Sequence, residues 1–152
     1  MILITSGCSF SECISDHIDT WPRHLQRHTK IPMISKGIGS QGNGLISRSI
    51  IYEVDRLLKQ EYSAEDMLVG IMWSGYSRWD YYWHKEDRGL DWKQENTDGW
   101  MCNPINFKHD DREGDWIITN YGWKSAKDYY KHYYDHTWGQ IQTLEHVLRT
   151  QW

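Results

Sequence analysis

Three short apolar runs alternate with helical patterns over the first half of the chain. The runs at 2–5, 31–35 and 67–73 have the length and composition of buried strands. Residues 21–28 fit a short helix with Thr20 as its N-cap and Pro22 in its first turn. A longer helix, capped by Asn43, carries apolar residues at helical spacing: Leu45, Ile46, Ile50, Ile51, Val54, Leu57 and Leu58. This β-α-β-α-β order predicts an α/β fold with a parallel sheet whose first strand lies in the middle.

The periodic pattern stops after Trp73. Residues 83–121 have no sustained period and contain Pro104 and several glycines. Long stretches of this kind in a compact domain usually serve function or interaction. We therefore expect an irregular, Trp/Tyr-rich insertion over 83–124.

Helical spacing returns near the end of the chain, over 125–152. Its apolar residues Ile141, Leu144, Val147 and Leu148 are expected to pack this helix on a face of the sheet. The final turn offers neither Gly nor Asn as a stop. The sequence thus predicts a single domain, 1–152, made of a core at 1–82, the insertion and this C-terminal helix.

Aromatic composition adds a functional hint. The chain has 10 Trp and 10 Tyr but only 2 Phe, and many of the Trp and Tyr residues crowd into 73–138. Trp and Tyr combine an apolar face with a polar tip, which suits wet interfaces and stacking on sugars. We interpret part of this set as a binding or interface surface, with a core poor in Phe as the alternative.

Charge and cysteine content exclude several classes. The net charge of -4 and pI near 6.0 lack the basic character of a nucleic-acid surface, so no nucleic-acid partner is expected. No apolar run has membrane-spanning length, and the N-terminus lacks a basic leader region. We expect a cytoplasmic protein without membrane contact. The odd set Cys8, Cys13 and Cys102 has no zinc-type spacing and is interpreted as reduced thiols.

Ser9 is the first candidate for chemistry, because it follows the first strand at the point where the chain must turn. A serine at such a turn can expose its Oγ at the sheet edge, with helix-start amides nearby to bind an oxyanion. Ser9 and Glu12 also fit a capping box, in which Ser9 only caps the next helix. Both interpretations remain open from these residues alone.

Two further patterns have alternative interpretations. Residues 37–42 match G-x-G-x-x-G between a strand and a helix, which is the context of a dinucleotide site, but the next strand ends without an acidic residue for a ribose. A tight turn lining another ligand is the alternative, and we expect no cofactor. His132 and His136, four apart on the expected helix, could face a metal together or form a solvated surface, and we expect no metal site.

The order of these blocks resembles that of the SGNH (GDSL-type) hydrolases. Gly7-Cys8-Ser9 stands where that family has Gly-Asp-Ser, the glycine turn at 37–43 looks like its second block, and 73–80 occupies the place of its third. The residues of the three blocks look most like those of a divergent branch of the family from phage and bacterial genomes. The resemblance implies a flavodoxin-like three-layer sandwich with a parallel sheet, truncated at the C-terminus.

The same resemblance implies a serine esterase acting on acyl or acetyl esters, most naturally of a carbohydrate. Ser9 would be the nucleophile, and the backbone N–H groups of Ser9 and of the Gly39-Ser40 turn would form the oxyanion hole. The substrate pocket would be shaped by four residues of the third block: Trp73, Ser74, Tyr76 and Trp79. Neither a cofactor nor a metal belongs to this chemistry.

The chain departs from the family pattern at three points. Cys8 replaces the Asp of the first block, and the third block has no Asn. No Asp-x-x-His follows, because the last His, His146, lies inside the expected helix and has no Asp three residues before it. A serine without a base is not an acyl-transfer site, and we expect no histidine of this chain to reach Ser9. The chain would then be an N-terminal piece of a longer hydrolase, or a catalytically inactive glycan-binding or structural module of a larger assembly, such as a virion. A missing fifth strand also predicts a protein partner or second copy covering the exposed sheet edge.

Overall fold

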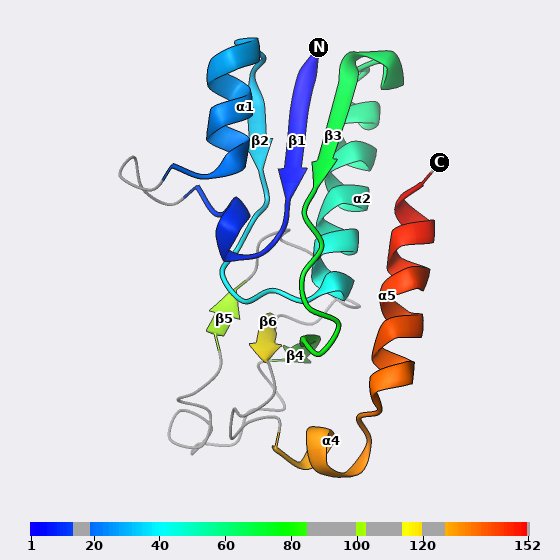
Figure 1. The fold of residues 1–152 in the computed structure, drawn as a ribbon. Coiled ribbons are helices and arrows are strands. Elements are labelled where there is room, and N and C mark those ends of the chain that lie inside the picture. The colour runs from blue at the N-terminus through cyan, green and yellow to red at the C-terminus, as the bar shows by residue number, and fades with distance from the viewer. Residues whose placement is uncertain (14–18, 85–99, 103–113, 120–126, 152) are drawn as a thin grey trace.

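The computed structural model describes residues 1–13, 19–84, 100–102, 114–119 and 127–151 (Figure 1). Its first half is an α/β unit built on a parallel sheet. Strands β1 (Ile2–Ser6), β2 (Met33–Ser35) and β3 (Met67–Ile71) lie in the order β2-β1-β3. The predicted β-α-β-α-β order and the central position of the first strand are therefore confirmed.

Helix α2 (Asn43–Lys59) covers one face of this sheet. Side chains alternate between the two faces along a strand, and Ile2 and Ile4 of β1 point to the same side. They form the core with Ile50 and Leu57 of α2, and all four are buried. Burial of this apolar surface is the main stabilising contribution to the unit.

Helix α1 (Trp21–Thr29) covers the opposite face. The ring of Trp21 lies against Gly70 of β3, where an added Cβ would meet the ring at 2.8 Å. Thr5, which faces away from Ile4, lies beside the same position. The indole nitrogen of Trp21 also donates a hydrogen bond to Ser11 Oγ at 2.8 Å. A single tryptophan thus attaches α1 to both the sheet and the turn after β1.

A second, antiparallel sheet follows the α/β unit. Strands β4 (Trp79–His84), β5 (Trp100–Cys102) and β6 (Gly114–Thr119) lie in the order β4-β6-β5. The expectation of irregular structure over 83–124 is wrong for these strands. Trp and Tyr favour strands, but each run is short and the pairing joins segments far apart in sequence. The rest of the expected insertion lies outside the described residues.

Two helices end the described chain: α4 (Lys127–His132) and α5 (His136–Thr150). Figure 1 shows α5 beside α2, and α5 packs against that helix. The expected packing on the sheet is wrong, since Ile141, Leu144 and Leu148 are 42%, 61% and 67% exposed. Helix α5 meets the start of α2 through Thr143 and His146. It ends at Gln151 in an extended conformation, without the left-handed residue of a glycine stop.

Two short 3₁₀ helices complete the description, η1 (Ser9–Ser11) after β1 and η2 (Ala64–Asp66) before β3. Within the described ranges, no helix has the length and apolar character needed to cross a membrane.

A buried carboxylate ties the loop after β2 to the middle of α2. Glu53 is 1% exposed and accepts from Lys36 Nζ at 2.9 Å and from Arg56 Nε at 2.9 Å. Burial alone would raise the pKa of Glu53, but the hydrogen bonds from Arg56 and Lys36 outweigh it and hold this pKa below its usual range. The ion pairs therefore stabilise the fold above the acidic range and are lost as the pH falls through the lowered pKa.

We expect Glu53→Gln to lower the free energy of unfolding by about 1–3 kcal/mol at pH 7, because it removes the buried charge that Lys36 and Arg56 both contact. Urea unfolding followed by circular dichroism measures this loss. Asp55→Asn is the matched control on the same helix, since Asp55 forms an exposed pair with Lys59 and should change stability by less than about 0.5 kcal/mol. Equal losses in the two variants would contradict the buried network.

Candidate functional site

The C-terminal ends of the three parallel strands leave the sheet at one edge, where open α/β sheets place their sites. Backbone hydrogen bonds join the three loops that leave this edge. Met72 N donates to Ser6 O at 3.0 Å, and Ile38 N donates to Gly7 O at 3.1 Å. The loops that carry the three predicted motif blocks therefore lie in contact.

Ser11 fills the space between the loop after β1 and the loop after β2. It is fully buried, and an added Cβ on Gly7 would lie 2.2 Å from its Oγ. An added Cβ on Gly37 would lie 2.3 Å from its carbonyl oxygen. Gly7 also has a φ of +156°. Both glycines are thus required by the close approach of η1 to the glycine loop.

Ser9 is exposed on the outer side of this turn. It is the first residue of η1, whose N-cap is Cys8, and its hydroxyl makes no hydrogen bond to any residue that the structure describes. The capping-box interpretation is therefore wrong, because the chain turns one residue earlier than a cap at Ser9 requires. The hydroxyl stands free at the C-terminal edge of the central strand.

The glycine loop is held in place from within by Gln41. Its buried side-chain amide donates to Gly7 O at 2.7 Å and to Ser6 Oγ at 3.2 Å. Ser40 adopts a left-handed conformation with φ of 66°. The role of Gln41 is not among the predictions from the sequence, although a polar residue among glycines in a turn is a signal for such a contact.

A carboxylate also lies beside this loop. An added Cβ on Gly39 would be 2.9 Å from Glu12 Oε2. Glu12 follows η1, so the turn that begins with Ser9 and the loop that contains Gly39 are neighbours. A negative charge beside Gly39 would repel an anionic intermediate formed there.

The third loop is joined to α2 by Asn43. Its Nδ2 donates to Ser74 O at 3.0 Å, and its Oδ1 accepts from Ser74 N at 2.7 Å. Nδ2 also contacts Thr143 Oγ1 of α5 at 3.0 Å. The prediction that Asn43 caps α2 is wrong: Gly42 is the N-cap, and Asn43 is the first helical residue.

The cap is supplied instead by Asp80 of β4. Its Oδ1 accepts from Gly42 N at 2.8 Å and its Oδ2 from Leu45 N at 3.0 Å. Burial of the carboxylate raises the pKa of Asp80 to about 6, although those amides and the charge of Arg48 act in the opposite direction. Asp80 occupies the helix terminus where a dinucleotide phosphate would bind, which counts against the G-x-G-x-x-G interpretation.

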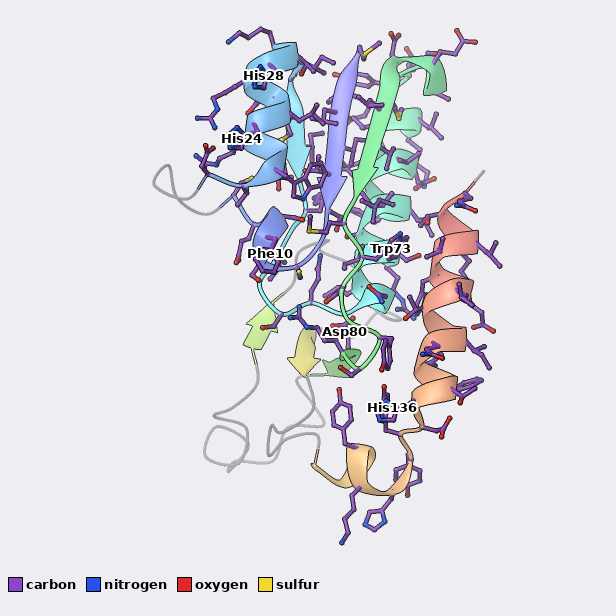
Figure 2. The ribbon with its side chains drawn as sticks, viewed as in Figure 1. Phe10, His24, His28, Trp73, Asp80 and His136 are labelled. Carbon is purple, nitrogen blue, oxygen red and sulfur yellow. The ribbon has the colours of Figure 1, made fainter. Side chains whose placement is uncertain are left out.

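Three of the four predicted substrate residues lie in the segment that links β3 to β4, and Trp79 begins β4. Trp73 and Ser74 are partly buried, whereas Tyr76 is exposed and its ring meets His136 edge-on at 5.9 Å between centroids. Figure 2 labels Trp73 on this segment and Asp80 on β4, which follows it. The strand position of Trp79 is described, but its side chain lies outside the described part.

The histidines are spread over the molecule. His24 and His28 lie along α1 and His136 at the start of α5 (Figure 2). His24 pairs with Asp19 at 2.8 Å, and none of the described histidine side chains is hydrogen-bonded to Ser9. His17 and His109 lie outside the described residues.

The expected common helix of His132 and His136 is interrupted. His132 ends α4, and His136 begins α5 with Asp135 as its N-cap, accepting from Trp138 N at 3.0 Å. The four-residue spacing therefore does not place the two imidazoles on one helix face. Among the described residues, no group of three or more His, Cys, Asp or Glu side chains could hold a metal ion.

Comparisons of the chain with protein-family models, with curated proteins and with solved structures found no match.

Asp80 predicts a specific pH dependence of stability. Its folded pKa of about 6 exceeds the ordinary value of 3.8, so the folded state binds the proton more tightly and loses stability as the pH rises through this window. We expect the difference in unfolding free energy between the wild type and Asp80→Asn to fall by about 1–3 kcal/mol from pH 4 to pH 7. Urea unfolding at each pH measures it, and a difference that stays constant would contradict burial of the carboxylate.

Proposed function

We propose that the protein is an SGNH-like serine esterase that cleaves acyl or acetyl esters of a carbohydrate. The strand order β2-β1-β3 is the order found around the switch point of flavodoxin-like sheets, in keeping with the proposed three-layer scaffold. The observation that carries the proposal is the exposed Ser9 hydroxyl, which has no described hydrogen-bond partner and lies at the C-terminal end of the central strand.

In this proposal Ser9 Oγ attacks the acyl carbonyl and loses its proton to a base. The ester oxygen leaves as the alcohol of the sugar, and water then hydrolyses the acyl-serine to release the carboxylic acid. The backbone N–H groups of Ser9 and of Gly39-Ser40 bind the oxyanion. The tight contacts of Ser11 with Gly7 and Gly37 support this by keeping the two loops in a fixed relation.

Substrate binding is assigned to the segment that links β3 to β4. Asn43 donates a hydrogen bond to Ser74 O and accepts one from Ser74 N. These two bonds fix the backbone of Ser74 beside Trp73. Tyr76 is exposed and offers an aromatic face suited to a sugar ring, and Trp79 is assigned here by the sequence pattern. The base is not assigned to a residue.

A second candidate function is a catalytically inactive module that binds glycans or takes part in a larger assembly. Two observations favour it. The carboxylate of Glu12 beside Gly39 would repel an oxyanion formed there, and the described histidines make no hydrogen bond to Ser9. A protein partner or second copy would then cover the outer edge of β3, where Leu68 and Val69 are exposed.

Ser9→Ala should abolish hydrolysis of p-nitrophenyl acetate above the buffer rate, because it removes the nucleophile. Ser63→Ala is the matched control: Ser63 caps η2, far along the chain from the site, and its loss should leave the rate unchanged. A fluorophosphonate probe should add one phosphonyl group to the wild type, with loss of fluoride, and none to Ser9→Ala by intact mass.

Equal rates and equal labelling of the wild type and Ser9→Ala would overturn the esterase proposal. The second function would then be supported by a saturable change in tryptophan fluorescence on adding an acetylated oligosaccharide. An unchanged fluorescence signal would contradict glycan binding as well.

A further inference from the structure

A polar cavity of about 120 Å³ lies between the start of α2, the segment before β4 and helix α5. One wall comes from α2, with Asn43 and Arg48, and another from α5, with Gln142 and His146. Arg78 and Asp80 close the side towards β4. The volume is several times the space that one water molecule needs. Ser9 is not among the residues that line it, but Tyr76, which is assigned above to substrate binding, is one of them, so the cavity adjoins the proposed esterase site.

Positive charge exceeds negative charge on the cavity wall. Arg48 and Arg78 bring two guanidinium groups, which stay charged at any physiological pH. Arg48 is an exposed residue, but its Nη1 comes within 2.9 Å of an added Cβ on Gly44 at the cavity wall. Asp80 is the opposing carboxylate, and both of its oxygens accept hydrogen bonds from α2 amides. The partial positive charge of the helix terminus therefore offsets part of the negative charge of Asp80, and less of that charge is left to balance the two arginines.

Two nitrogens of the cavity residues are buried without a hydrogen-bond partner in the described part of the chain: Arg78 Nη1 and His146 Nδ1. Buried polar atoms are normally satisfied by protein, water or ligand. Burial, together with Arg48 and Arg149, lowers the pKa of His146, so its imidazole is neutral at pH 7 and has one N–H to donate. A guanidinium and an imidazole N–H are both donors that suit an acceptor with several oxygens.

We propose that this cavity binds a small oxyanion, a carboxylate or phosphate group, between Arg78 and His146. Its oxygens would accept the hydrogen bonds that these two side chains lack, and its charge would balance the excess of the arginines. The small volume favours a single anionic group over a whole sugar ring. The contact of α5 with α2 would then be completed by the ligand, which fits the polar character of the facing α5 residues.

Isothermal titration calorimetry of the full chain with inorganic phosphate, and separately with acetate, tests this proposal. Chloride at matched ionic strength serves as the reference for unspecific salt effects. We expect saturable binding of at least one of the two probes and a rise in melting temperature with its concentration. Arg78→Gln should weaken the binding at least tenfold, whereas Arg27→Gln, on exposed α1, should leave it unchanged. The phosphate and acetate arms distinguish the two classes of anion.

A second pair of variants keeps the test decisive if Arg78→Gln fails to fold. Gln142→Glu places a carboxylate at the cavity, and charge repulsion should weaken anion binding at least tenfold. Gln140→Glu adds the same charge on the exposed side of α5 and should have little effect. Absence of saturable binding with both probes, or equal affinities in the two variants, would overturn the proposal and leave a water-filled cavity.

Discussion

The hydrogen bonds from the first amides of α2 to the carboxylate of Asp80 join the two halves of this protein. The helix comes from the parallel α/β unit, whereas Asp80 belongs to a strand of the antiparallel sheet. A buried carboxylate is costly unless its charge is met by donors, and a helix terminus leaves its first amides in need of acceptors. The antiparallel sheet therefore supplies acceptors for the first amides of α2, and those amides supply donors for the buried carboxylate. Gly42 permits this approach, since an added Cβ there would lie 2.7 Å from Asp80 Oδ2.

The rest of the site region follows from this junction. With β4 fixed against the start of α2, the segment after β3 must cross between them, and Asn43 holds it by pairing with Ser74. Asn43 reaches Thr143 from the same amide, which brings α5 to the same corner. The polar cavity is what remains between these elements. The contact of α5 with α2 at this corner is a polar one, while Ile141, Leu144 and Leu148 of α5 remain exposed.

The sequence predicted the parts of the fold that arise from local patterns. The three apolar runs became the three parallel strands, and the long periodic segment became α2, because both depend on residues adjacent in the chain. The face that α5 buries could not be predicted in the same way. Its apolar residues Ile141, Leu144 and Leu148 form a regular stripe, yet the partner helix α2 meets Thr143, and Gly139 lies against Tyr76 and Tyr134. The break before α5 did have a local signal, since Asp135 is a strong helix N-cap.

The residues of the candidate site also differ in whether a local pattern predicts them. Ser9 and the glycine loop were predicted from their positions after strands. The roles of Gln41 and Asp80 depend on contacts 34 to 38 residues away. The glycine-rich turn signals a contact at Gln41, but no local pattern reveals the distant partners of either residue. The helix cap expected at Asn43 was wrong for the same reason, because a distant carboxylate occupies that end of α2.

The packing around Ser11 has a consequence for how this chain can vary in evolution. Gly7 and Gly37 are closed to every larger side chain by Ser11 itself, whether or not the neighbouring Ser9 performs any chemistry. Selection for folding alone would therefore preserve a Gly-x-x-x-Ser signature after the first strand. Conservation of Gly7 and Ser11 among homologues would accordingly carry no information about catalysis. Only the exposed position of Ser9, which packing leaves free to change, would record whether selection has retained a nucleophile.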